Sequence, residues 1–130
     1  MTYQDVPPAL NILSNELIGL AIKVHKALGP GLLESSYKEC LFYEISRAGY
    51  FAEKEKTLPL IYETVKLDVG YRIDILVENK LVIEVKAVDA LADIHTAQVL
   101  TYLKLSGNRL GLLINFNVTL LKNGIKRLVI

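Results

Sequence analysis

Two short segments of this chain carry charged side chains at a spacing that could do chemistry. They are residues 72–77 and 81–87, and a short turn separates them. Both alternate apolar with polar or bulky side chains and are rich in β-branched types, which is typical of half-buried strands. Folded as a hairpin, the two strands would place Asp74 directly opposite Glu84, with Lys86 two residues further along on the same side. The other face of the hairpin would be entirely apolar, formed by Ile73, Ile75, Val77, Leu81, Ile83 and Val85.

Two carboxylates that face each other across a strand pair repel, unless a cation lies between them. A hard divalent cation such as Mg²⁺ takes one or two carboxylate oxygens together with water and substrate phosphate. A lysine beside that cation could orient a water molecule or offset negative charge. Asp74, Glu84 and Lys86 therefore form a candidate metal site for phosphate chemistry.

A structural interpretation of the same hairpin is also open. Each charged side chain could lie diagonal to an opposite charge on the neighbouring strand, as Arg72 would to Glu84. Exposed pairs of this kind are common and each contributes about 0 to 1 kcal/mol. The hairpin by itself slightly favours this surface arrangement, so the choice depends on the rest of the chain.

Three polar side chains share one side of a helix predicted at about 93–106. They are His95, Gln98 and Tyr102, spaced i, i+3 and i+7 among apolar neighbours. Polar groups in such a position need hydrogen-bond partners. The helix follows directly after the strand that carries Lys86, so Gln98 and Tyr102 could reach the end of the hairpin, or they could simply hydrogen-bond a loop. For His95 we favour a structural role.

The segment GLLESSY at 31–37 brings another carboxylate to a helix start. Glu34 falls in the first turn of a helix predicted at about 32–48, where a negative charge interacts favourably with the helix dipole. Lys38, four residues later, could pair with it for about 0.2 to 0.5 kcal/mol. Both are ordinary structural reasons for a glutamate at this position.

Hydrophobic periodicity predicts the elements that must position these side chains. Helices are expected at about 14–28, 32–48 and 93–106, and strands at 51–56, 58–62, 65–77, 81–87, 109–116 and 125–130, with a tight turn at 123–124. The apolar stripe of the second helix includes Cys40, which is therefore expected to be a buried structural thiol. The order of elements predicts a mixed α/β domain with a central sheet flanked by helices.

Length and composition limit the kinds of protein that this chain could be. With 130 residues, of which 52% are hydrophobic and 22% charged, the chain suits one compact domain over 1–130, with residues 1–10 as a flexible or loosely packed N-terminus. No apolar run reaches the roughly 18 to 20 residues of a membrane helix, and the N-terminus does not resemble a signal peptide. The single cysteine excludes an intramolecular disulfide and fits a reducing compartment. We therefore expect a cytoplasmic protein without a membrane partner.

The net charge of +1 does not indicate an overtly basic nucleic-acid binder. Phosphate binding would need locally clustered charge, for which Lys122, Lys126 and Arg127 are candidates. Composition alone therefore does not point to a nucleic-acid partner.

Three stretches of the sequence resemble the GxxExxY proteins, a small branch of the PD-(D/E)XK nuclease-like superfamily. They are GLLESSY at 31–37, KLDVGYRID at 66–74 and LINFN at 113–117. The similarity extends from about Asn11 to the C-terminus and implies an α/β fold with a restriction-endonuclease-like core, a central mixed β-sheet flanked by helices. The chain departs from the superfamily pattern where Ile73, not proline, precedes the first acidic residue.

The resemblance implies a metal site. Its first acidic residue matches Asp74, and its E-x-K element matches Glu84-Val85-Lys86. Asp74, Glu84 and the backbone carbonyl of Val85 would hold Mg²⁺ or Mn²⁺, which polarises the scissile phosphate and lowers the pKa of a bound water. Glu34 matches an acidic residue from the early helix and would bind a second metal or one of its waters.

The other matched residues would act on water and substrate. Lys86 would position the attacking water and balance developing negative charge. Gln98 and Tyr102 match a Q-x-x-x-Y element, in which Gln98 would fix Lys86 or a substrate phosphate. Tyr102 and Tyr37 would contact the substrate. The resemblance thus implies hydrolysis of phosphodiester bonds in nucleic acid, with DNA as the expected substrate, by the catalytic residues Glu34, Asp74, Glu84, Lys86 and Gln98.

Two alternatives remain at this point. The domain could be a non-catalytic nucleic-acid or protein interaction module that retains the nuclease fold, or a nuclease active only in a homo-oligomer or a larger assembly. The intact set Asp74, Glu84, Lys86 and Gln98 favours catalysis, because a purely structural descendant could have neutralised one of the opposed carboxylates. The lack of a basic stripe favours the interaction module.

Overall fold

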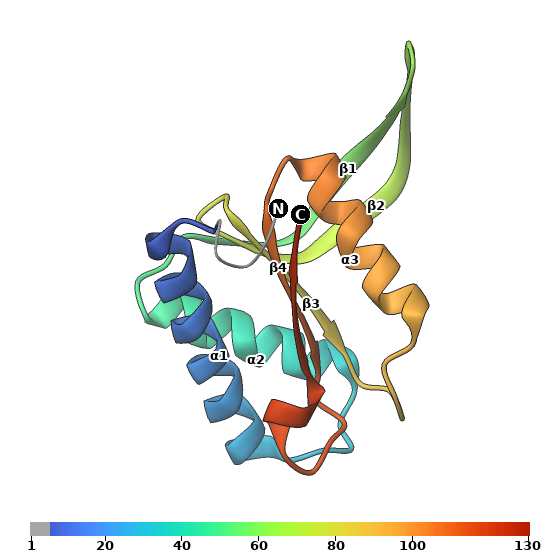
Figure 1. Cartoon of the computed structure of the whole chain (residues 1–130). Coiled ribbons are helices and arrows are strands. Elements are labelled where there is room, and N and C mark those ends of the chain that lie inside the picture. The colour runs from blue at the N-terminus through green and yellow to red at the C-terminus, as the bar shows by residue number, and fades with distance from the viewer. Residues whose placement is uncertain (1–5) are drawn as a thin grey trace.

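The computed structural model describes residues 6–130, apart from the side chain of Val69. Its elements are α1 (Pro8–Leu28), α2 (Glu34–Arg47), β1 (Ala52–Tyr62), β2 (Val65–Val77), β3 (Leu81–Lys86), α3 (Asp93–Ser106), β4 (Leu110–Asn115), the 3₁₀ helix η2 (Leu121–Gly124) and β5 (Ile125–Val129). The strands form one sheet in the order β1-β2-β3-β4-β5, antiparallel except for the parallel pair β3–β4 (Figure 1). The predicted mixed sheet flanked by helices is therefore confirmed.

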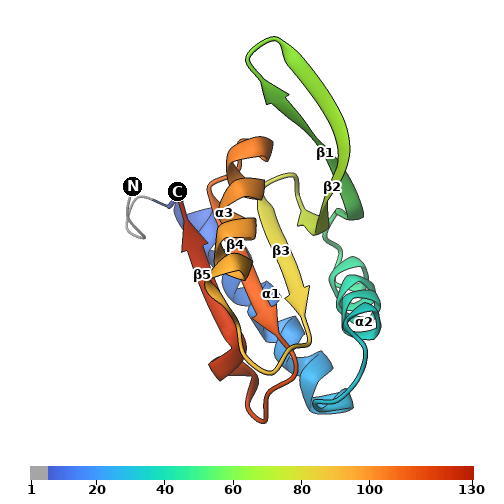
Figure 2. The same ribbon diagram turned by 90° about the vertical axis from the view of Figure 1, so that its right-hand side faces the viewer.

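Helices cover both faces of the sheet (Figure 2). On one face, α1 and α2 pack against Leu81, Ile83 and Val85 of β3. On the other face, α3 packs against Val82. A strand buried on both faces is apolar throughout, and Glu84 is the exception in β3. By alternation along the strand its side chain belongs to the α3 side.

The hairpin of β2 and β3 has the predicted register, with Ile75 opposite Ile83 and Val77 opposite Leu81. Its turn places Glu78 and Asn79 at φ of 54°, the left-handed conformation that matches the twist of a tight hairpin. Within β2, only Ile75–Val77 pair with β3, and the preceding part of the strand pairs only with β1.

Because β2 and β3 separate, the apolar face predicted for the hairpin is not continuous. Ile73, expected beside Ile75 and Val77, packs instead with the α3 cluster, whereas Ile75 and Val77 pack with α1 and α2. The prediction of one continuous apolar face was therefore wrong at Ile73, because β2 separates from β3 between Ile73 and Ile75.

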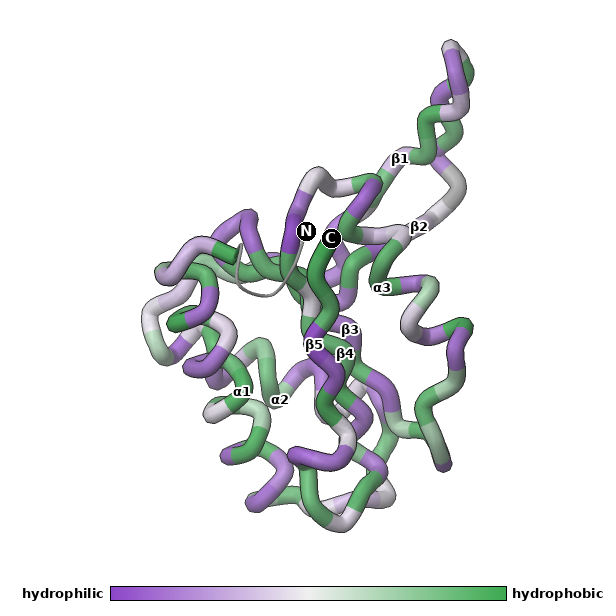
Figure 3. The backbone as a smooth tube through the Cα atoms, viewed as in Figure 1, coloured by the Kyte–Doolittle hydropathy of each residue, from purple (hydrophilic) through white to green (hydrophobic). Residues whose placement is uncertain are grey.

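Residues 57–71 of β1 and β2 form a two-stranded projection, which we call the arm (Figures 1 and 2). Both predicted strands, 51–56 and 58–62, belong to the single strand β1, whose pairing shifts between Leu58 and Leu60. Figure 3 shows hydrophobic residues on the arm next to hydrophilic ones. Ile61 and Tyr62 are 63% and 68% exposed there.

Both ends of the chain differ from expectation. Helix α1 begins at Pro8, and Val6 and Leu10 are buried, so the expected loose packing of residues 1–10 was wrong for residues 6–10. Residues 1–5 lie outside the described residues. Proline favours the first turn of a helix because it has no N–H to leave unpaired. The turn expected at 123–124 is the end of the 3₁₀ helix η2.

Helix α2 also presents a different stripe from the one expected. Tyr37, Leu41 and Ile45 are buried at i, i+4 and i+8, while Cys40 is exposed. The buried thiol was a wrong prediction, because the buried face is narrower than the apolar stripe. In the described part of the chain no helix is long and apolar enough to cross a membrane.

Candidate active site

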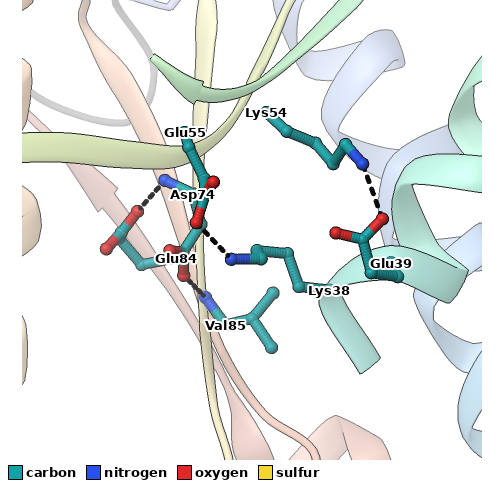
Figure 4. A network of polar contacts seen from close by, with 7 residues as sticks. All are labelled: Lys38, Glu39, Lys54, Glu55, Asp74, Glu84 and Val85. Atoms are coloured by element: carbon teal, nitrogen blue, oxygen red, sulfur yellow. Dashed lines mark hydrogen bonds and ion pairs between the residues drawn. The ribbon is translucent and has the colours of Figure 1, made fainter. Parts of the chain in front are cut away.

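Asp74 and Glu84 lie where β2 and β3 separate, and each binds the other's strand (Figure 4). The backbone N–H of Asp74 donates to Oε2 of Glu84 at 2.7 Å, and the N–H of Val85 donates to Oδ2 of Asp74 at 2.9 Å. The carboxylates thus replace carbonyl acceptors that the diverging strands no longer supply. The hydrogen bonds bring Asp74 and Glu84 close together, although the strand pairing itself does not extend beyond Ile75 and Ile83 to include them.

Burial shifts the titration of both carboxyl groups. Glu84 is 2% exposed, and burial, reinforced by the charge of Asp74, raises its pKa to about 8. Burial likewise raises the pKa of Asp74, against the hydrogen bond from Val85 and the charges of Lys38 and Lys86. A close pair of buried carboxyls resists holding two negative charges at once. The carboxylates Asp74 and Glu84 therefore do not belong to a solvent-exposed arrangement of diagonal ion pairs.

The donor groups at this point fit a hard divalent cation. Oδ1 of Asp74 and Oε1 of Glu84 accept no hydrogen bond from any described residue. The N–H and C=O of a strand residue point to the same side, so the Val85 carbonyl faces the gap into which its N–H donates. Two carboxylates, one carbonyl and water make a common Mg²⁺ environment. Within residues 6–130, no group of three or more acidic, histidine or cysteine side chains could hold a metal.

Lys86 borders the same region. Its positive charge lowers the pKa of both Asp74 and Glu84. Lys86 lines a groove together with Gln98 and Tyr102, and no described side chain forms a hydrogen bond or an ion pair with its ammonium group. The side chain is half-buried, and its charge is therefore available to an anionic ligand.

The family of the chain follows from a comparison of sequences. The family model of the PD-(D/E)XK nuclease superfamily matches residues 11–128. The chain belongs to the PD-(D/E)XK nuclease superfamily. Comparison with curated proteins and with solved structures found no match. The α/β architecture is accordingly the restriction-endonuclease-like fold of that superfamily.

The Q-x-x-x-Y element of this PD-(D/E)XK chain lies on one side of α3. Nε2 of Gln98 donates to the Tyr102 hydroxyl at 3.2 Å, and both side chains line the groove next to Lys86. His95 has the structural role that we favoured, because its Nδ1 accepts the N–H of Ala92 at 2.9 Å and caps the helix.

The GxxExxY segment positions the start of α2. Gly31 adopts φ of 100°, which glycine tolerates. The Tyr37 hydroxyl donates to the Gly29 carbonyl at 2.5 Å and accepts the Leu32 N–H at 3.0 Å. Its ring is fully buried and stacks on Phe116 at 4.7 Å. Tyr37 therefore holds the loop before α2 in place, and its contact with substrate stays a prediction.

Glu34 begins α2 and is exposed. Its charge raises the pKa of both Asp74 and Glu84, so the start of α2 faces the carboxylate pair. Its role at a second metal stays a prediction. The expected pair with Lys38 was wrong, since the Lys38 ammonium lies 3.0 Å from Glu55 of β1 (Figure 4).

Sequence reasoning missed two residues near the superfamily site. Lys38 is one, because its charge acts on Asp74; the only signal was its position one turn after Glu34. Asn115 is the other. Its side chain accepts the Val88 N–H at 3.1 Å and donates to the Val88 carbonyl at 2.9 Å, which holds the chain after Lys86. A lone polar residue in an apolar strand was the available signal.

The basic residues near the C-terminus lie on elements other than those that carry Asp74 and Glu84. They belong to η2 and β5, at the opposite edge of the sheet from β1. The Arg127 guanidinium donates to Ser14 at 2.9 Å and to Asn11, both on α1. Arg127 thus joins β5 to α1, and the cluster prediction was wrong for this residue.

Proposed function

We propose that this protein is a metal-dependent nuclease that hydrolyses phosphodiester bonds, with DNA as its substrate. The observation that carries the proposal is the exchange of hydrogen bonds between Asp74 and Glu84 at the strand divergence, with Lys86 bordering the same gap. The chain belongs to the PD-(D/E)XK nuclease superfamily, and by the sequence resemblance these residues match its acidic and E-x-K elements. The location that we propose is the cytoplasm, where the single cysteine stays reduced.

Asp74, Glu84 and the Val85 carbonyl would hold Mg²⁺ or Mn²⁺. When bound, the ion supplies Lewis-acid polarisation of the phosphate and lowers the pKa of a water molecule. With a pKa of about 8, Glu84 is largely protonated at neutral pH, so it would have to release its proton to serve as a ligand. The Val85 N–H keeps the Asp74 carboxylate oriented.

Lys86 would position the attacking water and offset the negative charge that develops on the phosphate. Gln98, whose amide donates to Tyr102, would contact a phosphate oxygen or Lys86 from the α3 side. Glu34 would serve a second ion from the start of α2. Phosphate contacts position a substrate without reading its sequence, so this residue set carries no preference for a particular cleavage site.

A non-catalytic interaction module is the second candidate, and the net charge of +1 favours it. In that case the carboxylate pair would only satisfy the two N–H groups of the diverging strands. A nuclease active only in a homo-oligomer or a larger assembly would show the metal affinity of the first proposal but would need its partner for turnover.

Cleavage assays separate these candidates. Purified protein would be incubated with single-stranded, duplex and branched DNA and RNA in Mg²⁺, Mn²⁺ or chelator. We expect metal-dependent cleavage that Lys86→Ala reduces by about two orders of magnitude or more, the loss typical of a group that stabilises developing charge. Metal affinity, from calorimetric titration with Mn²⁺, should stay unchanged, since Lys86 is not a ligand.

Lys80→Ala is the matched control, because Lys80 is exposed at the other end of β3. It should cut like the wild type. Equal cleavage by wild-type and Lys86→Ala protein would remove the catalytic assignment and point to a contaminating nuclease.

A further inference from the structure

A groove of about 570 Å³ lies between the arm and α3, and Lys86 also lines it. The arm contributes Leu60 and Tyr71 to one wall, and α3 contributes Ile94, Gln98 and Tyr102 to the other. The volume lies in the range of ligand sites in proteins. Because Lys86 belongs to both, the groove is continuous with the proposed active site.

The lining of the groove is mostly apolar and yet open to solvent. Ile94 is 71% exposed and Tyr71 is 39% exposed. Large apolar side chains that gather at an exposed concave surface commonly mark a binding site. The lining also carries polar groups, among them Lys86 and the pair Gln98 and Tyr102, which is hydrogen-bonded at 3.2 Å. The groove thus offers a cation and an amide together with aromatic and aliphatic faces.

A nucleotide has the matching distribution of groups, with an anionic phosphate at one end and a flat apolar base at the other. A base within a duplex keeps both faces stacked and cannot offer them to a protein. An unpaired base can stack on an aromatic side chain, whatever its identity. The other large groove, beside Glu78 and Lys80, lies at the turn end of the hairpin and cannot take a nucleotide adjoining the cut.

We propose that the groove between the arm and α3 binds an unpaired nucleobase next to the scissile phosphate, with Tyr71 as its stacking platform. The substrate is then DNA that is single-stranded at the cleavage point. The proposal deepens the nuclease assignment, on which it rests for the position of the cut. Base binding itself needs neither metal nor turnover.

The test measures binding in chelator, by fluorescence anisotropy of a labelled single-stranded DNA oligonucleotide and of the same sequence as a duplex. Wild-type protein should bind the single strand more tightly than the duplex. Tyr71→Ala should weaken single-strand binding by about five- to a hundredfold, the range reported by alanine substitution at a base-stacking side chain. Tyr71→Phe should bind like the wild type, since stacking needs the ring and not the hydroxyl.

Tyr62→Ala is the matched control, because Tyr62 is an exposed tyrosine of the same arm that does not line the groove. It should bind like the wild type. Ile94→Asp gives a second variant whose folding is not at risk, because Ile94 is exposed and acidic residues suit the first turn of a helix. It should also weaken single-strand binding, by charge repulsion.

Equal binding of single strand and duplex, or equal loss from Tyr71→Ala and Tyr62→Ala, would overturn the groove proposal. A changed oligomeric state in Tyr71→Ala, with single-strand binding intact, would assign the groove to a second copy of the chain and would also overturn it. Asp74→Asn separates the two proposals, because it should abolish cleavage and leave binding unchanged. If single-strand binding depends on Tyr71 but neither the wild type nor any variant cleaves DNA, the groove proposal is supported and the nuclease proposal is rejected. If DNA is cleaved but single-strand binding does not depend on Tyr71, the nuclease proposal is supported and the groove proposal is rejected.

Discussion

Glu84 combines a low exposure of 2% with a hydrogen bond to the neighbouring strand, which is an unusual position for a carboxyl group. Burial raises its pKa to about 8, and the nearby charges of Asp74 and Glu34 act in the same direction, while that of Lys86 opposes them. The metal-free protein therefore holds a proton here that the unfolded chain releases near pH 4.5. A bound cation would take the place of that proton.

Glu84→Gln should remove a pH dependence of stability. A carboxyl whose pKa is raised by folding binds more protons in the folded protein than in the unfolded chain. Its contribution to the free energy of unfolding is therefore greatest below about pH 4.5 and is lost as the pH rises towards about 8. In chelator, the free energy of unfolding of the wild type should fall across this window more steeply than that of Glu84→Gln. At pH 8 the variant should be more stable by at least about 1 kcal/mol. Urea unfolding at several pH values measures this, and parallel curves would contradict it.

At the scale of elements, two features create the site. The separation of β2 from β3 at Asp74, the residue before Ile75, leaves backbone N–H groups that donate hydrogen bonds to the carboxylates. The start of α2 faces the same place, and Tyr37 holds the loop before it through the Gly29 carbonyl and the Leu32 N–H. Gly31 and Tyr37 thus fix the backbone before α2, whereas the charge of Glu34 acts on Asp74 and Glu84.

Tyr37→Phe should therefore act on stability and on helix position. The ring can still stack on Phe116, but the Leu32 N–H and Gly29 carbonyl lose their partner, at a cost of about 1 to 3 kcal/mol. Chemical unfolding measures the loss. Mn²⁺ affinity should stay near the wild-type value, because Asp74 and Glu84 lie on other elements. Unchanged stability with weaker substrate binding would instead show that Tyr37 contacts the substrate.

For the whole molecule, metal binding and folding should be coupled. The two carboxylates come from strands that meet only in the folded sheet, so the unfolded chain has no such site. A ligand that binds only the folded state stabilises it by about 2.7 kcal/mol at one hundred times its dissociation constant. Stability would then report metal binding independently of any substrate.

Mn²⁺ should raise the unfolding temperature of the wild type and leave that of Asp74→Asn unchanged, because the variant lacks a charged ligand. Asp68→Asn is the control, since Asp68 is an exposed carboxylate on the same strand. It should respond to Mn²⁺ like the wild type. An equal shift in all three proteins, by scanning calorimetry, would place the metal elsewhere.

Local pattern was sufficient to predict the extent of α3, the bounds of β2, the hairpin register and the acidic pair. Strand alternation and helical spacing are short-range properties, so they can be read from neighbouring residues. The remaining features depend on tertiary packing. They are the burial of Tyr37, the exposure of Cys40, the ion pair of Lys38 with Glu55, the raised pKa of Glu84 and the groove between the arm and α3. Each of these depends on which distant element covers a side chain, and no local pattern specifies that.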